Sequence, residues 1–330
     1  MRSQGDKILG GIMQPFNENP FCKMLGIKYP IIQGGMAWIA DACLATAVSN
    51  AGGLGLIAAM NSNGEQLKAE IRKAKMLTDK PFGVNIMLQS PFVSEAADMV
   101  IAEDVKIITT GAGTPAPYME KWLRAGIKVM PVVPSAAYAR LMQRCGAAAV
   151  ICEGTEAGGH IGEITTMALT PQVCDTVTIP VAAAGGIADG RGMAAAFMLG
   201  AQGVQIGTRF LAATECCIHK NYKSMVFKAG DTGTVVTGKR FGHPVRSLKS
   251  AFSLNFQRLE SDELVTPEEI LKLGSGALRI AVQEGDLQKG SFMAGQSAGM
   301  VKKEQFVAEI IAEIVGEFKN LLKGAAECLG

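Results

Sequence analysis

The stretch Val181-Ala-Ala-Ala-Gly-Gly-Ile-Ala-Asp189 decides the fold of this chain. Its first four residues form a continuous apolar run, the pattern of a parallel strand that is covered on both faces. Two glycines follow directly, so the turn at the carboxyl end of this strand can approach a ligand closely. The same combination of a short apolar run and a special turn recurs along the chain, which indicates a sheet of parallel strands.

Eight such runs recur roughly every 20–31 residues, the period of a strand–loop–helix–loop unit. They are Tyr29–Gln33, Gly55–Ala58, Phe82–Met87, Val105–Thr110, Val129–Val133, Ala148–Cys152, Val181–Ala184 and Gly203–Ile206. Helical patterns lie between them at Ala40–Asn50, Gly64–Leu77, Ala116–Ala125, Ser135–Cys145 and Arg191–Leu199. Because special residues follow many strands rather than one, we predict an α/β fold of the (β/α)8 TIM-barrel type and not a doubly wound open sheet.

The regular spacing of predicted strands ends at Thr208, so we place a domain boundary there. The barrel core is expected at residues 15–208, an inserted lid or substrate subdomain at 209–300, and a closing helix that packs on the barrel at 301–330. Met1–Gln14 resembles a leader segment outside the fold. The stripe of the closing helix, predicted as core or oligomer contact, consists of Phe306, Ile310, Ile314, Phe318 and Leu321.

The composition argues against several classes of function. With 330 residues, 48% of them hydrophobic, the chain can bury a large core. The net charge of +2 and the lack of a long basic run argue against a nucleic-acid partner, and no apolar run reaches the length of a membrane span without a charge. The eight cysteines are scattered and form no C-x-x-C pair, so we predict no metal site and a cytoplasmic protein with reduced thiols.

The segment Glu153-Gly-Thr-Glu-Ala-Gly-Gly-His-Ile-Gly162 carries the candidate catalytic residue. It follows a buried strand, and its glycines let the backbone come close to a ligand. His160 is one of only three histidines, and an imidazole titrates near neutral pH. A glycine-rich turn with a solvated histidine is the alternative. The carboxyl ends of barrel strands meet on one face, which favours His160 as a site residue.

Two late turns indicate an anion site. In barrels, the loops after the last two strands often bind a phosphate through backbone N–H groups. The candidates are therefore Gly185, Gly186, Gly207 and Thr208. Tight strand-to-helix turns favour glycine in any case, but the occurrence of both turns at the two expected strands favours phosphate.

With these segments located, the chain closely resembles the flavin-dependent enoyl-acyl-carrier-protein reductase II family, a relative of the nitronate monooxygenases. The matching text is Pro30-Ile-Ile-Gln-Gly-Gly-Met-Ala37, Ala51-Gly-Gly-Leu-Gly55, Pro81-Phe-Gly-Val-Asn85, Thr109-Thr-Gly-Ala-Gly113, Val129-Met-Pro-Val-Val-Pro134, Glu153 to Gly162, Ala183-Ala-Gly-Gly-Ile187, Val204-Gln-Ile-Gly-Thr-Arg-Phe210 and Gly290-Ser-Phe-Met-Ala-Gly-Gln296. The resemblance runs from about Phe21 to the C-terminus. Glu153, where many nitronate oxidisers are expected to have glutamine, resembles the reductase branch.

The resemblance implies FMN at the barrel mouth, with NADPH or NADH as co-substrate and a monovalent cation left open. The implied cofactor-binding residues are Gly35, Met36, Ala37, Asn85, Glu153, Gly159, Ala184, Gly185, Gly186, Gln205, Ile206, Gly207 and Thr208. Lys128 is either a flavin contact, as in related oxidisers, or a solvated lysine. The resemblance also suggests a homodimer.

The activity implied is reduction of trans-2-enoyl thioesters on acyl carrier protein, in the last step of fatty-acid elongation, with His160 as proton donor or carbonyl partner. Nitronate oxidation by oxygen and a flavin-free phosphate-binding barrel are the alternatives. His219 is expected in a solvated helix, whereas His243 on the lid is left open as a second site residue. A cluster on the lid, either a solvated face or a contact for carrier protein or a cofactor phosphate, consists of Lys239, Arg240, Arg246 and Lys249.

Overall fold

The computed structural model describes residues 15–59 and 62–328. Eight parallel strands form its centre in the order β1-β9-β8-β6-β5-β4-β3-β2. They are β1 (Ile31–Gln33), β2 (Gly55–Ala58), β3 (Phe82–Met87), β4 (Ile107–Gly111), β5 (Lys128–Val133), β6 (Val150–Glu153), β8 (Val181–Ala184) and β9 (Gly203–Ile206). The Leu54 N–H donates to the Ile31 carbonyl at 2.8 Å, which connects the first and last strands of this order. The predicted (β/α)8 barrel is confirmed.

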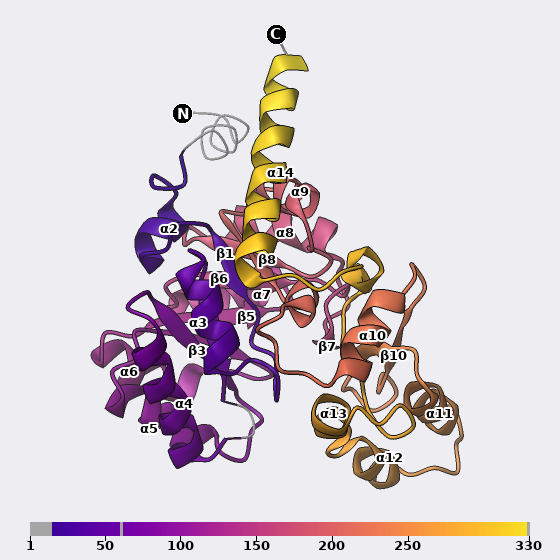
Figure 1. Ribbon diagram of the computed structural model, residues 1–330. Helices are drawn as coiled ribbons and strands as arrows, with labels where there is room; N and C mark the ends of the chain where they lie inside the picture. Colours follow the sequence, from indigo (N-terminus) through magenta and orange to yellow (C-terminus); the bar gives the residue numbers. More distant parts are fainter. Residues whose placement is uncertain (1–14, 60–61, 329–330) are drawn as a thin grey trace.

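Helices cover the outside of the barrel (Figure 1). They are α3 (Ala42–Asn50), α4 (Gly64–Leu77), α5 (Val93–Ala102), α6 (Ala116–Arg124), α7 (Ala136–Arg144), α8 (Thr166–Thr176) and α9 (Gly190–Met198). The short helix α2 (Pro20–Leu25) precedes β1, and its Phe21 and Leu25 pack in one cluster with residues of the barrel strands. Capping side chains fix where several of them begin. Asp41 accepts the Leu44 N–H at 2.9 Å at the start of α3, and Asp189 accepts the Gly192 N–H at 3.0 Å at the start of α9.

Two helical features differ from the sequence-based expectation. No helix was predicted between β3 and β4, where α5 lies; its amino-terminal residue Phe92 makes no side-chain capping bond, so the usual start signal is missing. Between β6 and β8 the sequence indicates a long, irregular connection before any helix near Pro171–Thr176, but α8 begins at Thr166 and contains Pro171 in its interior.

The segment between β9 and α14, predicted as a lid and called the lid below, is tied to a barrel loop. It contains η1 (Thr208–Ala212), α10 (Lys220–Lys228), β10 (Thr234–Thr237), β11 (Val245–Leu248), α11 (Ala251–Glu260), α12 (Pro267–Gly274), α13 (Ala277–Arg279), η2 (Ile280–Glu284) and η3 (Gln296–Met300). The short strand β7 (Gly159–His160), in the loop after β6, adds to the β10–β11 hairpin as a third antiparallel strand. The lid therefore holds one edge of the loop that carries His160.

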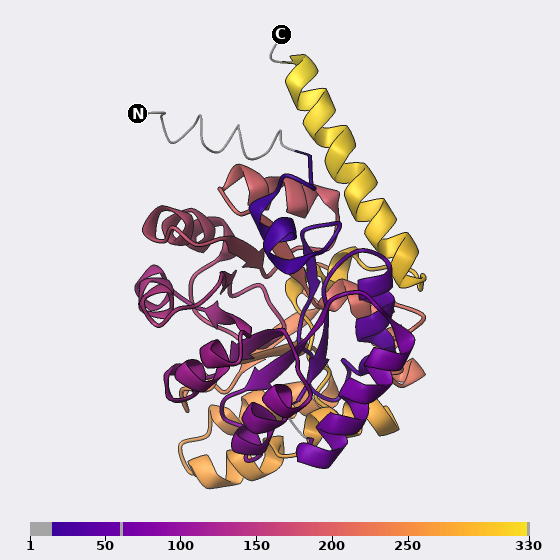
Figure 2. The same cartoon turned by 90° about the vertical axis from the view of Figure 1, so that its left-hand side faces the viewer.

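The last helix, α14 (Val307–Cys328), packs against α9 and α3 through its first half. Its carboxyl-terminal end extends beyond the barrel, as Figure 2 shows. Ile310, Ile314 and Phe318 are buried, as predicted. Phe306 precedes the helix and is 56% exposed, and Leu321 lies on the protruding end and is 41% exposed, so these two residues are not part of the core. For them the alternative of an oligomer contact stays a prediction.

The predicted leader, residues 1–14, lies outside the described part of the chain. None of the helices within residues 15–59 and 62–328 combines the length and the hydropathy needed to cross a membrane.

Candidate functional site

A cavity of about 240 Å³ opens at the carboxyl ends of the barrel strands, below the lid. Most residues predicted from the sequence line it, although they come from five different strands and the loops that follow them. These are Gly35, Met36, Ala37, Asn85, Glu153, Gly159, His160, Ala184, Gly185, Gly186, Gln205, Gly207 and Thr208. Ile206 is the exception, because its side chain is 1% exposed within the core and does not reach the cavity.

The loop after β1 passes close to β3. A Cβ atom at Gly35 would lie 2.2 Å from the Cγ atom of Asn85, so only glycine fits at this position. Asn85 is itself fixed, because its Nδ2 donates to the Thr109 hydroxyl at 2.9 Å. Asn85 also lines the cavity.

Glu156 organises the turn after β8. Its carboxylate accepts the Thr166 backbone N–H at 2.9 Å and the Thr166 hydroxyl at 3.0 Å. Thr166 also contacts the carbonyl oxygen of Gly185 at 3.0 Å. Gly185 and Gly186 have φ angles of 96° and 75°, which residues with a side chain rarely adopt. The backbone of this turn therefore requires glycine at both positions. Sequence reasoning missed Glu156, since its role depends on a residue ten positions away.

The side of the cavity formed by the barrel strands is polar. Glu153, Ala184 and Gln205 are paired residues on three neighbouring strands, so their side chains lie in one row. The small Ala184 separates the two polar ones. The Oε1 atom of Gln205 is buried without a protein partner, and Gln205 lines the cavity. Burial raises the pKa of Glu153 to about 7. This row therefore presents unsatisfied hydrogen-bonding groups to a ligand.

His160 lines the cavity and is held in place by the pairing of β7 with β11 of the lid. It is paired with Val245 of β11, and the next residue, Ile161, donates its N–H to the Pro244 carbonyl at 3.1 Å. Burial, and to a smaller extent the charge of His243, lowers the pKa of His160 below its ordinary value. The imidazole keeps surface at the cavity mouth, and at neutral pH it is an uncharged donor and acceptor. His243, which the sequence analysis left open as a second site residue, is exposed and does not line the cavity. Its charge nevertheless acts on His160.

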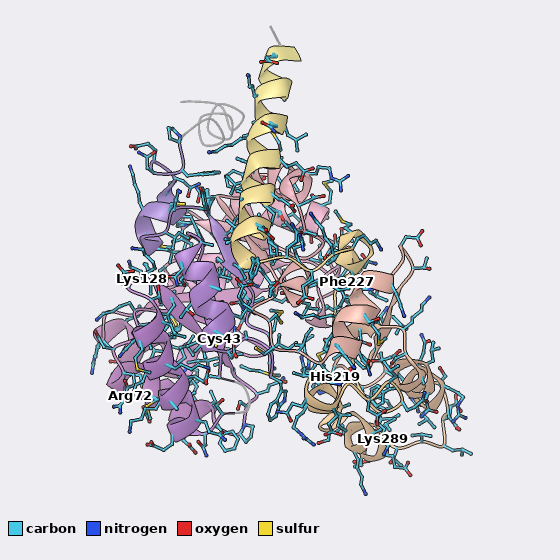
Figure 3. All side chains as sticks on the ribbon, viewed as in Figure 1. Cys43, Arg72, Lys128, His219, Phe227 and Lys289 are labelled. Carbon is cyan, nitrogen blue, oxygen red and sulfur yellow. The ribbon has the colours of Figure 1, made fainter. Side chains whose placement is uncertain are left out.

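The charge of the lining is unusual for a phosphate site. Among the described residues that line the cavity, none is a lysine or an arginine, whereas Glu153, Glu156 and His160 are titratable. A phosphate there must be held by backbone N–H groups and hydroxyls rather than by a cation. Lys128 does not serve this purpose: it begins β5, at the opposite end of the barrel, and its Nζ donates to the Met24 carbonyl in α2 (Figure 3). The interpretation of Lys128 as a flavin contact is therefore wrong.

In the predicted basic cluster on the lid, Arg246 is buried, whereas Lys239, Arg240 and Lys249 are exposed. Arg246 is 8% exposed, and its guanidinium donates to the Thr155 carbonyl and the Thr234 hydroxyl, both at 3.0 Å. It joins the β6 loop to the hairpin and is unavailable to a partner. Arg240 donates to the Glu260 carbonyl at 3.0 Å.

His219 also differs from its prediction as a solvated helical residue. It is the half-buried cap of α10, where Nδ1 accepts the Asn221 N–H at 3.1 Å (Figure 3). It takes no part in the cavity lining.

Two residues at the rim of the cavity, Trp38 and Ala112, stand out by a positive φ angle, which the sequence does not reveal. Trp38 has a φ of 65° and is 41% exposed, and both of its neighbours in the chain line the cavity. Ala112, in the lining itself, has a φ of 53°. Positive φ at a tryptophan is a strained conformation of the kind that concentrates at functional sites. No spacing or composition signal marks either residue.

Comparison with known proteins agrees with this geometry. The profile of the nitronate monooxygenase family matches residues 18–103 and 93–317. The chain is 34% identical over 327 residues to a probable nitronate monooxygenase of Staphylococcus saprophyticus, covering 84% of this chain and 92% of that protein. Over 245 residues it is 40% identical to a Mycobacterium tuberculosis protein named (3aS,4S,5R,7aS)-5-hydroxy-7a-methyl-1-oxo-octahydro-1H-indene-4-carboxyl-CoA dehydrogenase, covering 73% of this chain and 68% of that protein.

Among solved structures, FabK from Thermotoga maritima is similar over nearly its whole length. The TM-score is 0.92 and the sequence identity 47%, with 94% of this chain and 99% of that chain covered. The similarity includes both the barrel and the lid, because the aligned part leaves only 6% of this chain outside.

Proposed function

The chain belongs to the nitronate monooxygenase family of oxidoreductases, and we propose that within it this protein is an FMN-dependent enoyl-acyl-carrier-protein reductase that uses NADH or NADPH. The observation that carries the proposal is the likeness to FabK, an enoyl-acyl-carrier-protein reductase II, across nearly the full length of both chains. It is stronger than the likeness to the relatives named as nitronate monooxygenases, at 47% against 34% identity.

The residues of the cavity fit FMN. The turn at Gly185 and Gly186, together with Gly207 and Thr208, would hold the phosphate through backbone and hydroxyl groups. Gln205 has a buried oxygen that needs a donor, which the N–H of a flavin ring can supply. The lack of a Cβ at Gly35 lets the β1 loop lie against Asn85, and Gly35, Met36 and Ala37 of this loop line the cavity.

When bound, FMN supplies hydride transfer from the nicotinamide to the double bond of a trans-2-enoyl thioester. The protein has to position the thioester and stabilise the enolate charge on its oxygen. His160 is suited to this because its neutral imidazole can donate one N–H without adding charge to the cavity. Apolar side chains from three separate segments, Ile39, Leu211 and Leu278, line the same cavity and suit an acyl chain.

Nitronate oxidation by oxygen is the second candidate, favoured by the name of the family and of the Staphylococcus relative. It uses the same cavity and cofactor, so the geometry alone supports both. A flavin-free phosphate-binding barrel is less consistent with the polar row at Glu153 and Gln205, which lies on the strands and away from the two phosphate turns.

The test of the proposal is the variant His160→Ala. It should retain FMN, because His160 is not part of the phosphate turns, and lose most enoyl-thioester reduction, with a fall in kcat of about a hundredfold or more. His243→Ala is the matched control: it removes the exposed neighbouring imidazole and should keep turnover within a few-fold. Undiminished reduction by the His160 variant would remove this residue from the mechanism.

A further inference from the structure

Trp38 belongs to a tight turn at the rim of the flavin cavity. The N–H groups of Ile39 and Ala40 both donate to the Met36 carbonyl, at 3.0 and 2.8 Å. The Ala58 N–H, at the end of β2, donates to the Ala40 carbonyl at 2.8 Å and so ties the turn to the barrel. Met36 and Ile39 line the cavity. The position of Trp38 at the rim is therefore fixed by backbone hydrogen bonds on both sides of it.

Stability of the fold does not explain a tryptophan at this position. Trp38 is the third residue of the turn and has a φ of 65°. A positive φ at the third position of a turn favours glycine or asparagine, because a larger side chain strains the backbone. Burial compensates little of this strain, since Trp38 is 41% exposed. Trp122, the other tryptophan, is 0% exposed, and its indole N–H donates to the Ala97 carbonyl at 3.0 Å.

The indole of Trp38 is also unengaged. Within residues 15–59 and 62–328, no aromatic ring stacks on it, no cation lies over it and no side chain or carbonyl bonds to it. The described lining of the cavity contains no lysine or arginine either. A ligand that enters here therefore meets a flat apolar ring rather than a positive charge. Such a ring binds heteroaromatic groups by stacking.

Of the two substrates in the proposed reaction, only one always carries heteroaromatic rings. The acyl chain of an enoyl thioester has none, and it is suited by the apolar lining residues Ile39, Leu211 and Leu278. A nicotinamide dinucleotide has two such rings, nicotinamide and adenine. Only the nicotinamide exchanges hydride with the flavin, so the remainder of the dinucleotide has to extend past the rim of the cavity.

We propose that Trp38 binds the nicotinamide dinucleotide by stacking its indole on one of the two heteroaromatic rings, adenine or nicotinamide. The inference rests on the proposed function, because oxidation of a nitronate by oxygen needs no dinucleotide. Trp38 is then a contact for the hydride donor and not for the thioester. Its loss should weaken flavin reduction and leave flavin reoxidation unchanged, which separates the two halves of the reaction.

The first experiment is anaerobic stopped-flow reduction of FMN-loaded protein over a range of NADH and, separately, NADPH concentrations. Trp38→Gly removes the ring and tolerates the positive φ, so the turn is kept, whereas Trp38→Phe keeps a flat ring. Trp38→Gly should raise the half-saturating dinucleotide concentration by about tenfold or more, with a limiting rate within a few-fold of wild type. Trp38→Phe should stay within a few-fold in both quantities.

Two controls separate this effect from a general defect. Reoxidation of the reduced variants by the crotonyl thioester of N-acetylcysteamine, which has no aromatic ring, should match that of the wild type. Phe306→Ala removes another exposed aromatic side chain, one outside the cavity lining, and should leave both half-reactions unchanged.

The second experiment measures binding and needs no variant, so it decides the proposal even if Trp38→Gly loses FMN. Iodide quenches exposed indoles, and of the two tryptophans only Trp38 is exposed. NAD+ or NADP+, which cannot reduce the flavin, should protect the fluorescence of FMN-loaded protein from iodide. Protection by ADP-ribose would identify adenine as the stacked ring, and protection by nicotinamide mononucleotide would identify nicotinamide.

Several results would overturn the proposal. If NADH or NADPH bleaches the wild type but Trp38→Gly has an unchanged half-saturating concentration, or oxidised dinucleotides give no protection, this inference fails and the proposed function stands. A wild-type flavin that neither dinucleotide bleaches removes both. Protection by coenzyme A alone would assign the indole to a coenzyme A thioester. Quenching that falls with rising protein concentration alone would assign it to a second copy of the chain.

Discussion

Replacing Glu153 by glutamine removes the one carboxyl group whose ionisation the cavity opposes. In the unfolded chain this group loses its proton near the ordinary value of 4.5, whereas in the folded protein burial raises its pKa to about 7. Between these values the folded state binds more protons than the unfolded state, so wild-type stability falls as pH rises and is level above about 7. The difference between the two pKa values corresponds to a loss of unfolding free energy of about 3 kcal/mol at most, since water in the cavity reduces the pKa difference.

The assay is urea unfolding of FMN-free protein at about pH 5 and about pH 8, since the linkage acts across that interval. The difference in unfolding free energy, Glu153→Gln minus wild type, should become more positive by about 2–3 kcal/mol from the lower to the higher pH. Glu163→Gln, which removes an exposed carboxylate from the same loop, is the control for the loss of a charge there. Parallel pH profiles for wild type and Glu153→Gln would refute the reasoning, because Glu153 would then ionise freely in the folded protein.

Two further variants test the geometry around the cavity. Gly35→Ala should lower FMN affinity by at least about tenfold, because the new Cβ meets Asn85 at 2.2 Å and the β1 loop must move; unchanged flavin fluorescence titrations would show that this loop is not a cofactor contact. Arg246→Met should destabilise the protein by about 2–3 kcal/mol, because two buried charge-assisted hydrogen bonds at 3.0 Å are lost. Its affinity for carrier protein should stay unchanged, and the opposite pattern, full stability in urea with weaker carrier binding, would return Arg246 to a surface role.

The barrel could be predicted from the sequence because its strands are continuous apolar runs with a regular period. All eight strands lie where these runs lie, with ends shifted by one or two residues at β1, β4, β5 and β6. His160 and the glycines of the two late turns followed from the same rule, since the carboxyl ends of the strands must converge, whereas the resemblance to the reductase family supplied the other cofactor-binding residues. Ile206 failed because side chains alternate along a strand, and in β9 the neighbouring Gln205 is the one that faces the cavity.

Features that depend on contacts between distant segments could not be read from the sequence. Burial of Arg246 arises from pairing of β7 with β11, two strands that are too short and too far apart to show a pattern. Lys128 was left open as a flavin contact or a solvated lysine. It is the first residue of β5, at the end of the barrel opposite the cavity, and it is exposed. Glu156 and Trp38 carry no local signal, since a carboxylate bond to Thr166 and a positive φ become visible only in three dimensions.

The central claim is that this flavin cavity reduces enoyl thioesters. Its most direct test is an anaerobic stopped-flow measurement on FMN-loaded protein that has been bleached with NADH or NADPH. We predict that crotonyl thioester restores the flavin absorbance rapidly, and faster than dissolved oxygen does in a parallel mixture. The account would be contradicted if the thioester left the flavin bleached while the oxidised protein, supplied with oxygen, turned over an alkyl nitronate. That result would identify the protein as a nitronate monooxygenase.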